Sequence, residues 1–392
     1  MKGIDISTTE FTKKAVITCE HFGFRHAAAY RQYPECKNCS VSLSNNSNAN
    51  DRRKDGVGGL LANAINTYTA EKLHAIEGPV LYYNLEPVPR TGETALTLHI
   101  FGVEKSIAEA ILIQTLRSLV NDLGVTAHTV RINSLGDADS QTRYVRELTN
   151  YLKKRLGDIP VTARELMKDH VVLALQHLLE KQHPLAHKTP NPLEHLTDQS
   201  RRHFREIVEY LDMSETPYEI DPKLLGSYQC FHDAVFSFDL QDEEGLSLAE
   251  EPIMIRGGRM SNFFEKHLRK SVPAVGAVAI LRNKRAPARL PQPTGSKPSI
   301  FMVQLGFGPK VRSLLLLDQL RKVGINVHQN LASDSLSAQL REAEDRGALY
   351  TIIIGQKEYV EGTVILRDMK GRNQESLPMT DLIHRLRKVK AV

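Results

Sequence analysis

The chain has 392 residues, of which 25% are charged and 41% hydrophobic, a balance that excludes a disordered protein. Its four cysteines argue against a disulfide framework, and a formal charge of +5 permits a phosphate-rich partner without requiring one. No apolar run approaches the roughly 18 residues of a membrane span, and residues 1–7 lack the features of a signal peptide. We therefore expect a cytoplasmic protein with no membrane partner.

Helices and strands alternate through the first part of the chain, with no internal repeat. A Ser/Asn cluster at residues 39–54 indicates a loop, and apolar residues at helical spacing predict a helix over 106–123. A strand is predicted at 130–133. The other expected elements are amphipathic helices at 140–154 and 199–211, a Pro-rich loop at 183–192, and strands at 234–240, 253–255 and 274–281.

A Pro-rich and basic segment divides the chain. Residues 283–298, NKRAPARLPQPTGSKP, offer little to bury and predict a solvated linker. We therefore predict a large domain at 1–282 and a second domain at 299–392.

The last ninety or so residues predict a small α/β domain with a largely parallel sheet. The apolar run at 301–305 is closed by Gly306, and a leucine-rich helix over 311–323 is closed by Gly324. Further strands are expected at 325–327, 350–354 and 363–367, with helices at 335–346 and 381–389.

The amino-acid sequences of these segments resemble those of a known family. LRKVGINV, AQLREAEDRGALYTIIIGQKE and GTVILRDMKGRNQESLP resemble the anticodon-binding domain of class II aminoacyl-tRNA synthetases, in particular that of histidyl-tRNA synthetases. In the large domain, GPVLYYN, HIFGVE, RINSLGD, IRGGR and VPAVGA follow the order of the same family. The resemblance covers most of residues 50–390. It implies an α+β fold: an antiparallel sheet flanked by helices and bearing the catalytic cleft, then a small anticodon-binding-type α/β domain.

The nucleotide-binding motifs of that family are only partly present. Amino-acid activation adds negative charge to an α-phosphate, so an arginine must face it. Arg90, in EPVPRTGE, resembles the motif 2 arginine, but Gly92 replaces the glutamate expected two positions later. Arg282 matches the motif 3 arginine only with a one-residue slip, whereas Asn283 matches without one. The resemblance therefore makes Arg90 and Arg282 candidate nucleotide-binding residues.

The histidine pocket departs further from the family. Asp55 in RKDG and Glu104 in FGVE keep the two substrate-binding carboxylates, whereas Ile100 stands where the family has glutamine. The family's RGLDYYT aligns with residues 226–232, so Gly226 replaces the arginine that helps catalysis. That alignment also replaces other pocket residues by Gln229, Cys230 and Phe231. The GGRYDGL motif keeps only Arg259, which joins Arg90 as a catalytic candidate.

These losses lead to a hypothesis with two alternatives. One lost phosphate contact of this kind costs about 10²–10³ in rate, and several are missing. We expect a histidyl-tRNA synthetase-like protein with a degenerate cleft that acts in translation through tRNA or partner binding. The first alternative is an active but divergent histidine–tRNA ligase that uses ATP and Mg. The second is a structural or regulatory dimerisation module.

The resemblance also implies partners. tRNA is the first, and the candidate contacts in the tail are Gln339, Arg341, Lys357 and Arg367. A second copy of the chain is the other, because the family is dimeric and the apolar segments 57–65 and 80–83 exceed what a small sheet face needs to bury. Cys36 and Cys39 have zinc-ligand spacing but form only half a site, so no metal site is predicted.

Overall fold

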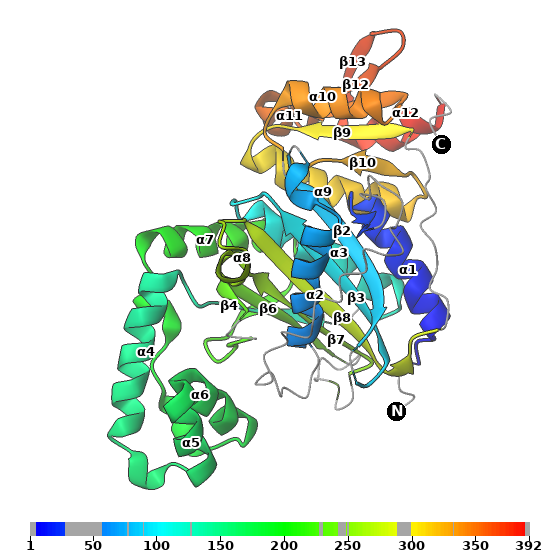
Figure 1. Ribbon diagram of the computed structural model, residues 1–392. Coiled ribbons are helices and arrows are strands. Elements are labelled where there is room, and N and C mark those ends of the chain that lie inside the picture. Colours follow the sequence, from blue (N-terminus) through cyan, green and yellow to red (C-terminus); the bar gives the residue numbers. More distant parts are fainter. Residues whose placement is uncertain are drawn as a thin grey trace.

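A computed structural model describes most of the chain, namely residues 5–27, 57–76, 78–88, 90–125, 128–226, 230–241, 248, 251–287, 299–331 and 333–388. Within these residues the strands form two sheets, one of eight strands and one of five (Figure 1). The predicted loop at 39–54 and most of the predicted linker lie outside the described residues.

The eight-stranded sheet is antiparallel through its centre. Its order is β1-β2-β3-β8-β7-β6-β4-β5, and only the short edge strands β1 and β5 pair in parallel with their neighbours. The strands are β1 (Arg25–His26), β2 (Val80–Pro87), β3 (Glu93–Phe101), β4 (His128–Ser134), β5 (Tyr218–Ile220), β6 (His232–Leu240), β7 (Ile253–Arg259) and β8 (Ala274–Arg285). The predicted antiparallel sheet is therefore confirmed.

Apolar residues on both sides of the strands explain why helices cover both faces. On β3, Leu96, Leu98 and Ile100 point into a core shared with α1 (Thr8–His21) and α3 (Ile107–Asp122). Ala95 and Phe101 point to the opposite face, where α2 (Val57–Ala70) and α8 (Ser261–Leu268) pack. The resemblance implies a catalytic cleft on this sheet, and α1 and α3 cover its other side, so we call this second side the cleft face.

A helical segment inserted after β4 extends beside the sheet (Figure 1). It contains α4 (Ala138–Lys153), α5 (Val161–Asp169) and α6 (Val171–Glu180), and α7 (Asp198–Met213) then returns to the sheet. Short 3₁₀ turns lie at Leu73–Ala75, Leu156–Asp158, Pro184–Lys188 and Pro192–His195. Asp137 caps α4 by accepting from Ser140 N at 2.9 Å, and Thr197 caps α7 by accepting from Ser200 N at 3.3 Å.

The C-terminal unit is the predicted small α/β domain with two additions, the helix α11 and the strand β13. Its sheet order is β10-β9-β11-β12-β13, with β9, β10 and β11 parallel and β12 and β13 antiparallel. The elements are β9 (Ile300–Gln304), α9 (Phe307–Lys322), β10 (Val327–Gln329), α10 (Leu336–Asp345), β11 (Tyr350–Ile354), α11 (Gln356–Glu361), β12 (Thr363–Asp368), β13 (Gln374–Pro378), a 3₁₀ turn at Met379–Asp381 and α12 (Leu382–Lys388). The sequence did not predict β13, whose exposed polar residues give no apolar alternation.

Helix α1 joins the two sheets. One apolar core runs from the back of the large sheet, through α1 and α3, to α9 and β10. His21 Nε2 donates to Leu317 O at 3.0 Å, and Gln329 Nε2 donates to Phe22 O at 2.6 Å. The C-terminal unit is therefore packed firmly on the large sheet.

Three sequence-based expectations change at this point. Strand β8 runs to Arg285, three residues into the range 283–298 predicted as a linker. The apolar segments 57–65 and 80–83 are buried within the chain itself, in α2 and β2, so they no longer argue for a dimer interface. Ile100, compared above with a pocket glutamine, is fully buried on the α3 side of the sheet and not on the cleft face.

Candidate functional site

The middle of the cleft face is mainly apolar. Thr97, Val278, Arg256 and Ser237 are directly opposite one another on β3, β8, β7 and β6, so their side chains share this face. In this row Thr97 and Val278 are buried, and Arg256 is half-buried. The next row along the strands consists of Ala95, Ile280 and Met254, all of them buried. These two rows thus present one arginine beside two hydroxyl groups and four apolar side chains.

Arg259, the last residue of β7, is in register with Val275 and Ile100, so it points to the α3 side of the sheet and not to the cleft face. It forms the best-defined polar contact at this end of the sheet. Its side chain is 5% exposed, and its Nε and Nη2 donate to the two carboxylate oxygens of Glu109 at 2.7 Å each. Nη1 donates to Val103 O at 3.2 Å, and Nη2 also donates to Lys105 O at 3.3 Å. Every guanidinium nitrogen therefore has a protein acceptor, in the two-pronged geometry that makes arginine–carboxylate pairs strong.

The charges of this pair are maintained by their surroundings. Burial by itself would raise the pKa of the Glu109 carboxyl, but Arg259 and His203 outweigh burial and hold that pKa at about 2. His203 Nε2 lies 3.0 Å from Glu109 Oε1. Burial disfavours the imidazolium form, yet Glu109 prevails and raises the pKa of His203 above its ordinary value. The Glu109–Arg259 pair is thus ionised at neutral pH.

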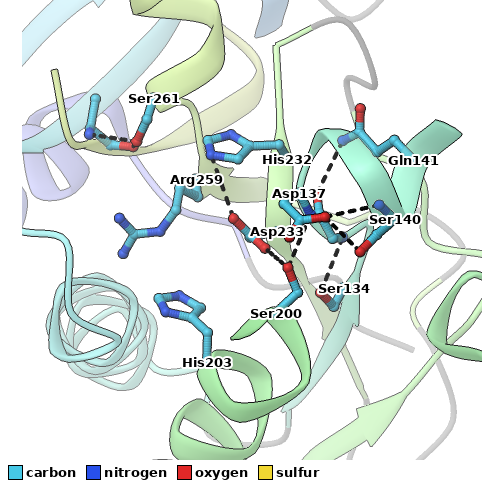
Figure 2. A network of polar contacts seen from close by, with 12 residues as sticks. Ser134, Asp137, Ser140, Gln141, Ser200, His203, His232, Asp233, Arg259 and Ser261 are labelled. Carbon is cyan, nitrogen blue, oxygen red and sulfur yellow. Dashed lines mark hydrogen bonds and ion pairs between the residues drawn. The ribbon is translucent and has the colours of Figure 1, made fainter. Parts of the chain in front are cut away.

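A second set of polar contacts lies beside Arg259 and His203 and joins β6 to the inserted helices (Figure 2). Asp233 accepts from Ser200 Oγ at 2.7 Å, and Ser200 Oγ accepts from Asp137 N at 3.0 Å. Asp137 also accepts from Thr197 Oγ1 at 2.6 Å. His232 lies 3.6 Å from Asp233, and burial lowers the pKa of His232 to about 4. These contacts fasten α4 and α7 to β6.

The other two arginines that the sequence singled out lie at the opposite end of the sheet. Arg90 is exposed in the turn between β2 and β3, with a left-handed φ of 75°. Arg282 on β8 is 40% exposed and lies 3.8 Å from Glu93. A surface hollow of about 400 Å³ here is lined by Thr91, Glu93, Arg282, Asn283 and Arg285.

The structure thus brings Arg90 and Arg282 to the same end of the sheet but separates both from Arg259. Arg259 is opposite Val275, and the seven residue steps along β8 from Val275 to Arg282 span about 24 Å at about 3.4 Å per step. Arg259 and Arg282 cannot hold the same phosphate group across that distance.

Comparisons with known proteins agree with this fold. A family model described as an anticodon binding domain matches residues 313–389. The histidine–tRNA ligase of Thermosynechococcus vestitus is 24% identical, over 84% of this chain and 78% of that protein. The corresponding ligase of Halothermothrix orenii is 25% identical, over 84% of this chain and 80% of that protein. Over 84% of its length, the chain is similar to these two histidine–tRNA ligases.

Other relatives are matched at similar levels. The histidine–tRNA ligase of Symbiobacterium thermophilum is 26% identical, over 80% of this chain and 73% of that protein. Among solved structures, apo S. aureus histidyl-tRNA synthetase aligns with 82% of this chain and 80% of its own, at 16% identity and a TM-score of 0.44.

The two carboxylates expected to bind substrate stay a prediction, because only one of them lies within the described residues. Glu104 is exposed in the segment between β3 and α3, and Asp55 lies outside the described residues. Gly226 has φ of 55°, and a Cβ added there would lie 3.1 Å from the Phe231 ring. An arginine at that position, as the family has it, would be strained. Gln229 lies outside the described residues, and Cys230 and Phe231 are buried in the apolar core of the cleft face.

The four candidate tRNA contacts divide into two kinds. Gln339 is fully buried, accepts from Gln304 N at 3.2 Å and donates to Gln304 O at 3.0 Å. We correct the sequence-based prediction at this position, because a side chain enclosed in the domain cannot reach RNA. Arg341 on α10 and Lys357 on α11 are exposed, and Arg367 on β12 is half-buried. These three stay predictions.

The described residues do not fit ATP with Mg in a reactive arrangement. Arg259 is fully engaged with Glu109, and Arg90 and Arg282 lie at the far end of the sheet. In the described ranges, no three His, Cys, Asp or Glu side chains are grouped so that they could hold a metal ion. Cys36 and Cys39 lie outside those ranges. No helix in them has the length and apolar character needed to cross a bilayer.

Sequence reasoning missed the polar network around Arg259. Glu109 was the available signal, since it is a charged residue between Ala108 and Ala110 on the apolar side of the helix predicted over 106–123. A buried carboxylate requires a cationic partner, and Arg259 is that partner. Ser200, His203 and Asp233 gave no comparable signal, because each is typical of a protein surface.

Proposed function

We propose that this chain is a histidyl-tRNA synthetase-like protein that binds tRNA in translation and whose cleft does not activate histidine. The anticodon binding domain match at 313–389 and the names of the curated relatives support the tRNA half of this proposal. The position of Arg259 and its ion pair with Glu109 support the second half, that the cleft does not activate histidine. The division into 1–282, a linker and 299–392 is part of the same proposal.

The position of Arg259 is the observation that carries the inactive cleft, because its side chain pairs with Glu109 of α3 on the side of the sheet opposite the cleft face. A phosphate ligand would have to compete with a Glu109 carboxylate already held at 2.7 Å through two hydrogen bonds. Releasing Arg259 would leave Glu109, which is completely buried, without its main countercharge. Arg259 therefore serves as a structural cation, and Gly226 supplies no replacement.

Histidine-dependent exchange between ATP and pyrophosphate tests the inactive cleft. We expect no exchange above a protein-free blank with histidine or any other amino acid. A complete histidyl-tRNA synthetase measured in parallel establishes that the assay works. Robust exchange with histidine would overturn the proposal of an inactive cleft. It would favour the alternative of an active but divergent histidine–tRNA ligase.

Filter binding to total tRNA across a salt series tests the tRNA half. We expect binding whose logarithm falls linearly with the logarithm of salt concentration, because phosphate contacts release counterions. Arg341→Ala with Arg367→Ala should lower the magnitude of this slope by roughly 1.4–1.8, at about 0.7–0.9 per lost contact.

A matched variant in the same domain controls for net charge. Arg312 and Lys322 are exposed on α9, and their double alanine variant removes the same two charges. This control should keep the wild-type slope. If the full-length protein does not bind tRNA even at low salt, the tRNA half falls and a dimerisation module becomes the better reading. The homodimer itself stays a prediction that light scattering can check against the 44.0 kDa chain.

A further inference from the structure

A surface hollow lies where the large domain meets the C-terminal unit, and we call it the junction hollow. Helix α9 lies at this junction and contacts α3 of the large domain (Figure 1). The hollow has a volume of about 410 Å³, within the range of about 300–1,000 Å³ that is usual for small-molecule sites. Its charged lining comes from both units: Arg117 and Asp122 of α3, and Arg321 and Lys322 of α9. A molecule held here would therefore touch both units at once.

The carboxylate that lines the junction hollow is already occupied. Asp122 Oδ2 accepts from Thr18 Oγ1 at 3.1 Å and forms an ion pair with Arg321. A second carboxylate, Asp318, lies 3.0 Å from Arg321 Nη2 and 2.8 Å from Lys322 Nζ. Two carboxylates thus offset the charges of Arg321 and Lys322.

Arg117 is the cation that these carboxylates leave over. It is half-buried, and its Nη1 donates to Ser214 O and Thr216 Oγ1 at 3.1 Å each, while Nη2 donates to Glu215 O at 3.0 Å. These three acceptors are neutral groups. No carboxylate in the described part of the chain forms an ion pair with Arg117, and Asp318 and Glu215 act on it only from longer range. The junction hollow therefore has positive charge in excess.

Two guanidinium nitrogens at the junction hollow lack an acceptor. Nε of Arg117 and Nε of Arg321 are buried, and neither has a hydrogen-bond partner among the described residues. The Arg321 side chain is only 10% exposed, and a buried N–H without an acceptor is unfavourable. An anion with several oxygen atoms is the kind of group that would supply such acceptors.

Stabilisation of helix ends does not account for the excess charge. Cations often offset the partial negative charge at a helix C-terminus, and α3 and α9 both end beside the hollow. The terminal carbonyls of these helices already have donors, however. Lys14 Nζ donates to Asp122 O at 3.1 Å, and Ile325 N donates to Leu320 O at 2.9 Å. A ligand explains the surplus that capping does not.

We propose that the junction hollow binds inorganic phosphate or a small phosphate monoester, held by Arg117 of the large domain and by Arg321 and Lys322 of the C-terminal unit. A monoester carries about −1.5 to −2 charge at pH 7, and its oxygens match the fork of a guanidinium. The bound phosphate would connect the two units. This inference goes beyond the proposed function, because it requires no tRNA.

The shape of the junction hollow favours a small ligand over the backbone of an RNA. A backbone phosphate is a diester with one negative charge, and it is part of a continuous strand. Such a strand would meet Lys322, whose side chain is 63% exposed, but not Arg321, whose side chain is 10% exposed. A small phosphate can enter the hollow and reach both.

Inorganic phosphate is the probe, added to the full-length protein in a buffer free of phosphate and sulfate. We expect saturable binding in isothermal titration calorimetry. We also expect a higher melting temperature than in sodium chloride of the same ionic strength, because a ligand that binds only the folded state stabilises it. Dimethyl phosphate, which has the single charge of an RNA backbone phosphate, should bind at least tenfold more weakly.

Two variants place the phosphate in the junction hollow. Lys322→Ala removes an exposed cation and should weaken phosphate binding by about tenfold. Asn121→Asp changes a half-buried lining residue of α3 without changing its shape and should abolish phosphate binding. Because the new carboxylate meets excess positive charge, Asn121→Asp should not lower the melting temperature measured without phosphate. Loss of binding in a stable variant is a result that a purely structural role of these cations does not predict.

Arg312→Ala is the matched control. Arg312 is exposed on the same helix as Lys322 but does not line the junction hollow, so this variant removes an equal charge. It should keep the wild-type affinity for phosphate. Equal weakening by Arg312→Ala and Lys322→Ala would show that phosphate responds only to net charge, and the proposal would fall.

The other outcomes also overturn the proposal. If wild-type protein shows no effect of phosphate beyond that of sodium chloride, the hollow holds no phosphate. If Arg282→Ala weakens binding while the two junction variants do not, phosphate is bound at the hollow beside Arg282. If Lys322→Ala leaves phosphate binding intact but lowers the salt slope of tRNA binding, Lys322 is an RNA contact. The first two results leave the tRNA half of the proposed function untouched, so the two proposals can fail separately.

Discussion

Arginines at the two ends of the eight-stranded sheet experience opposite environments. At one end, Arg259 is 4% exposed and donates to Glu109 and two backbone carbonyls. At the other end, the Arg282 side chain is 40% exposed and only approaches Glu93 at 3.8 Å. A family motif that retains an arginine therefore does not reveal whether the side chain serves a ligand or holds the fold together. Its acceptors decide that question.

The two environments also have different energetic consequences. An exposed ion pair such as Arg282–Glu93 contributes about 0–1 kcal/mol, because water screens it. A buried pair adds little net stability relative to an apolar pair of the same shape, but loss of one partner leaves an uncompensated charge. The buried end should thus be sensitive to single substitutions and the open end should tolerate them.

Replacement of Glu109 should give the largest effect. Glu109→Ala removes the carboxylate from buried Arg259 and should lower the free energy of unfolding by about 3–5 kcal/mol. Urea denaturation followed by circular dichroism measures the change. Arg282→Ala at the open end is the control, because this half-exposed side chain only approaches Glu93 at 3.8 Å, and it should cost less than about 1 kcal/mol. Equal losses from the two substitutions would remove the distinction between the two ends.

Replacing Gly226 by the arginine that the family has there should lower the stability less than Glu109→Ala does. It should also restore no activity. Gly226→Arg places a side chain on a left-handed backbone, beside the Phe231 ring, and should lower the free energy of unfolding by about 2 kcal/mol. It should not restore histidine-dependent pyrophosphate exchange, because residues of a reaction centre act as a unit. Recovery of exchange in this single variant would show that the cleft is intact apart from one residue.

The loss of folding stability caused by protonation of His232 at acid pH should be the smallest of these effects. Burial lowers its pKa to about 4, with Asp233 opposing and Arg259 reinforcing the shift. The stability contributed by the neutral imidazole is complete above the unfolded pKa of about 6.5 and falls as pH drops toward 4. At pH 5.5 the loss relative to pH 7.5 should be about 1.4 kcal/mol greater in wild type than in His232→Asn.

The pKa of His203 is shifted in the opposite direction to that of His232, so His203 is the internal comparison for that experiment. Its raised pKa means that its stabilisation is complete below about pH 6.5 and is lost as pH rises through the folded value. His203→Asn should therefore alter the alkaline side of the stability profile and leave the acid side as in wild type. Parallel pH profiles for wild type and both variants would contradict the assignment of these shifts.

The fold could be predicted well from the sequence because its signals are local. Glycines at 306 and 324 have φ of 93° and 79°, a backbone that glycine adopts without strain, so they marked element ends correctly. Strand β13 was missed because Gln374, Glu375 and Ser376 are exposed and have no apolar alternation. Its position depends on pairing with β12, which a local pattern does not contain.

The candidate site was harder to predict because its contacts join distant residues. Glu109 and Arg259 are 150 positions apart, and Ser200 and Asp233 are 33 apart. Motif comparison named Arg259 but could not show that Glu109 occupies it. Gln339 looked like a surface residue within an amphipathic helix, whereas its amide is enclosed by Gln304. Residue type alone did not distinguish a buried amide from a surface one.

The packing of α1 between the large sheet and the C-terminal unit has a consequence for biosynthesis. His21 and Phe22 leave the ribosome early, yet their partners Leu317 and Gln329 follow 296 and 307 residues later. At about 5–20 residues per second, that side of α1 waits roughly 15 to 60 s before the C-terminal unit can cover it. A nascent chain stalled before residue 300 therefore exposes an apolar helix surface, and it is the stage of synthesis at which chaperone binding and aggregation should concentrate.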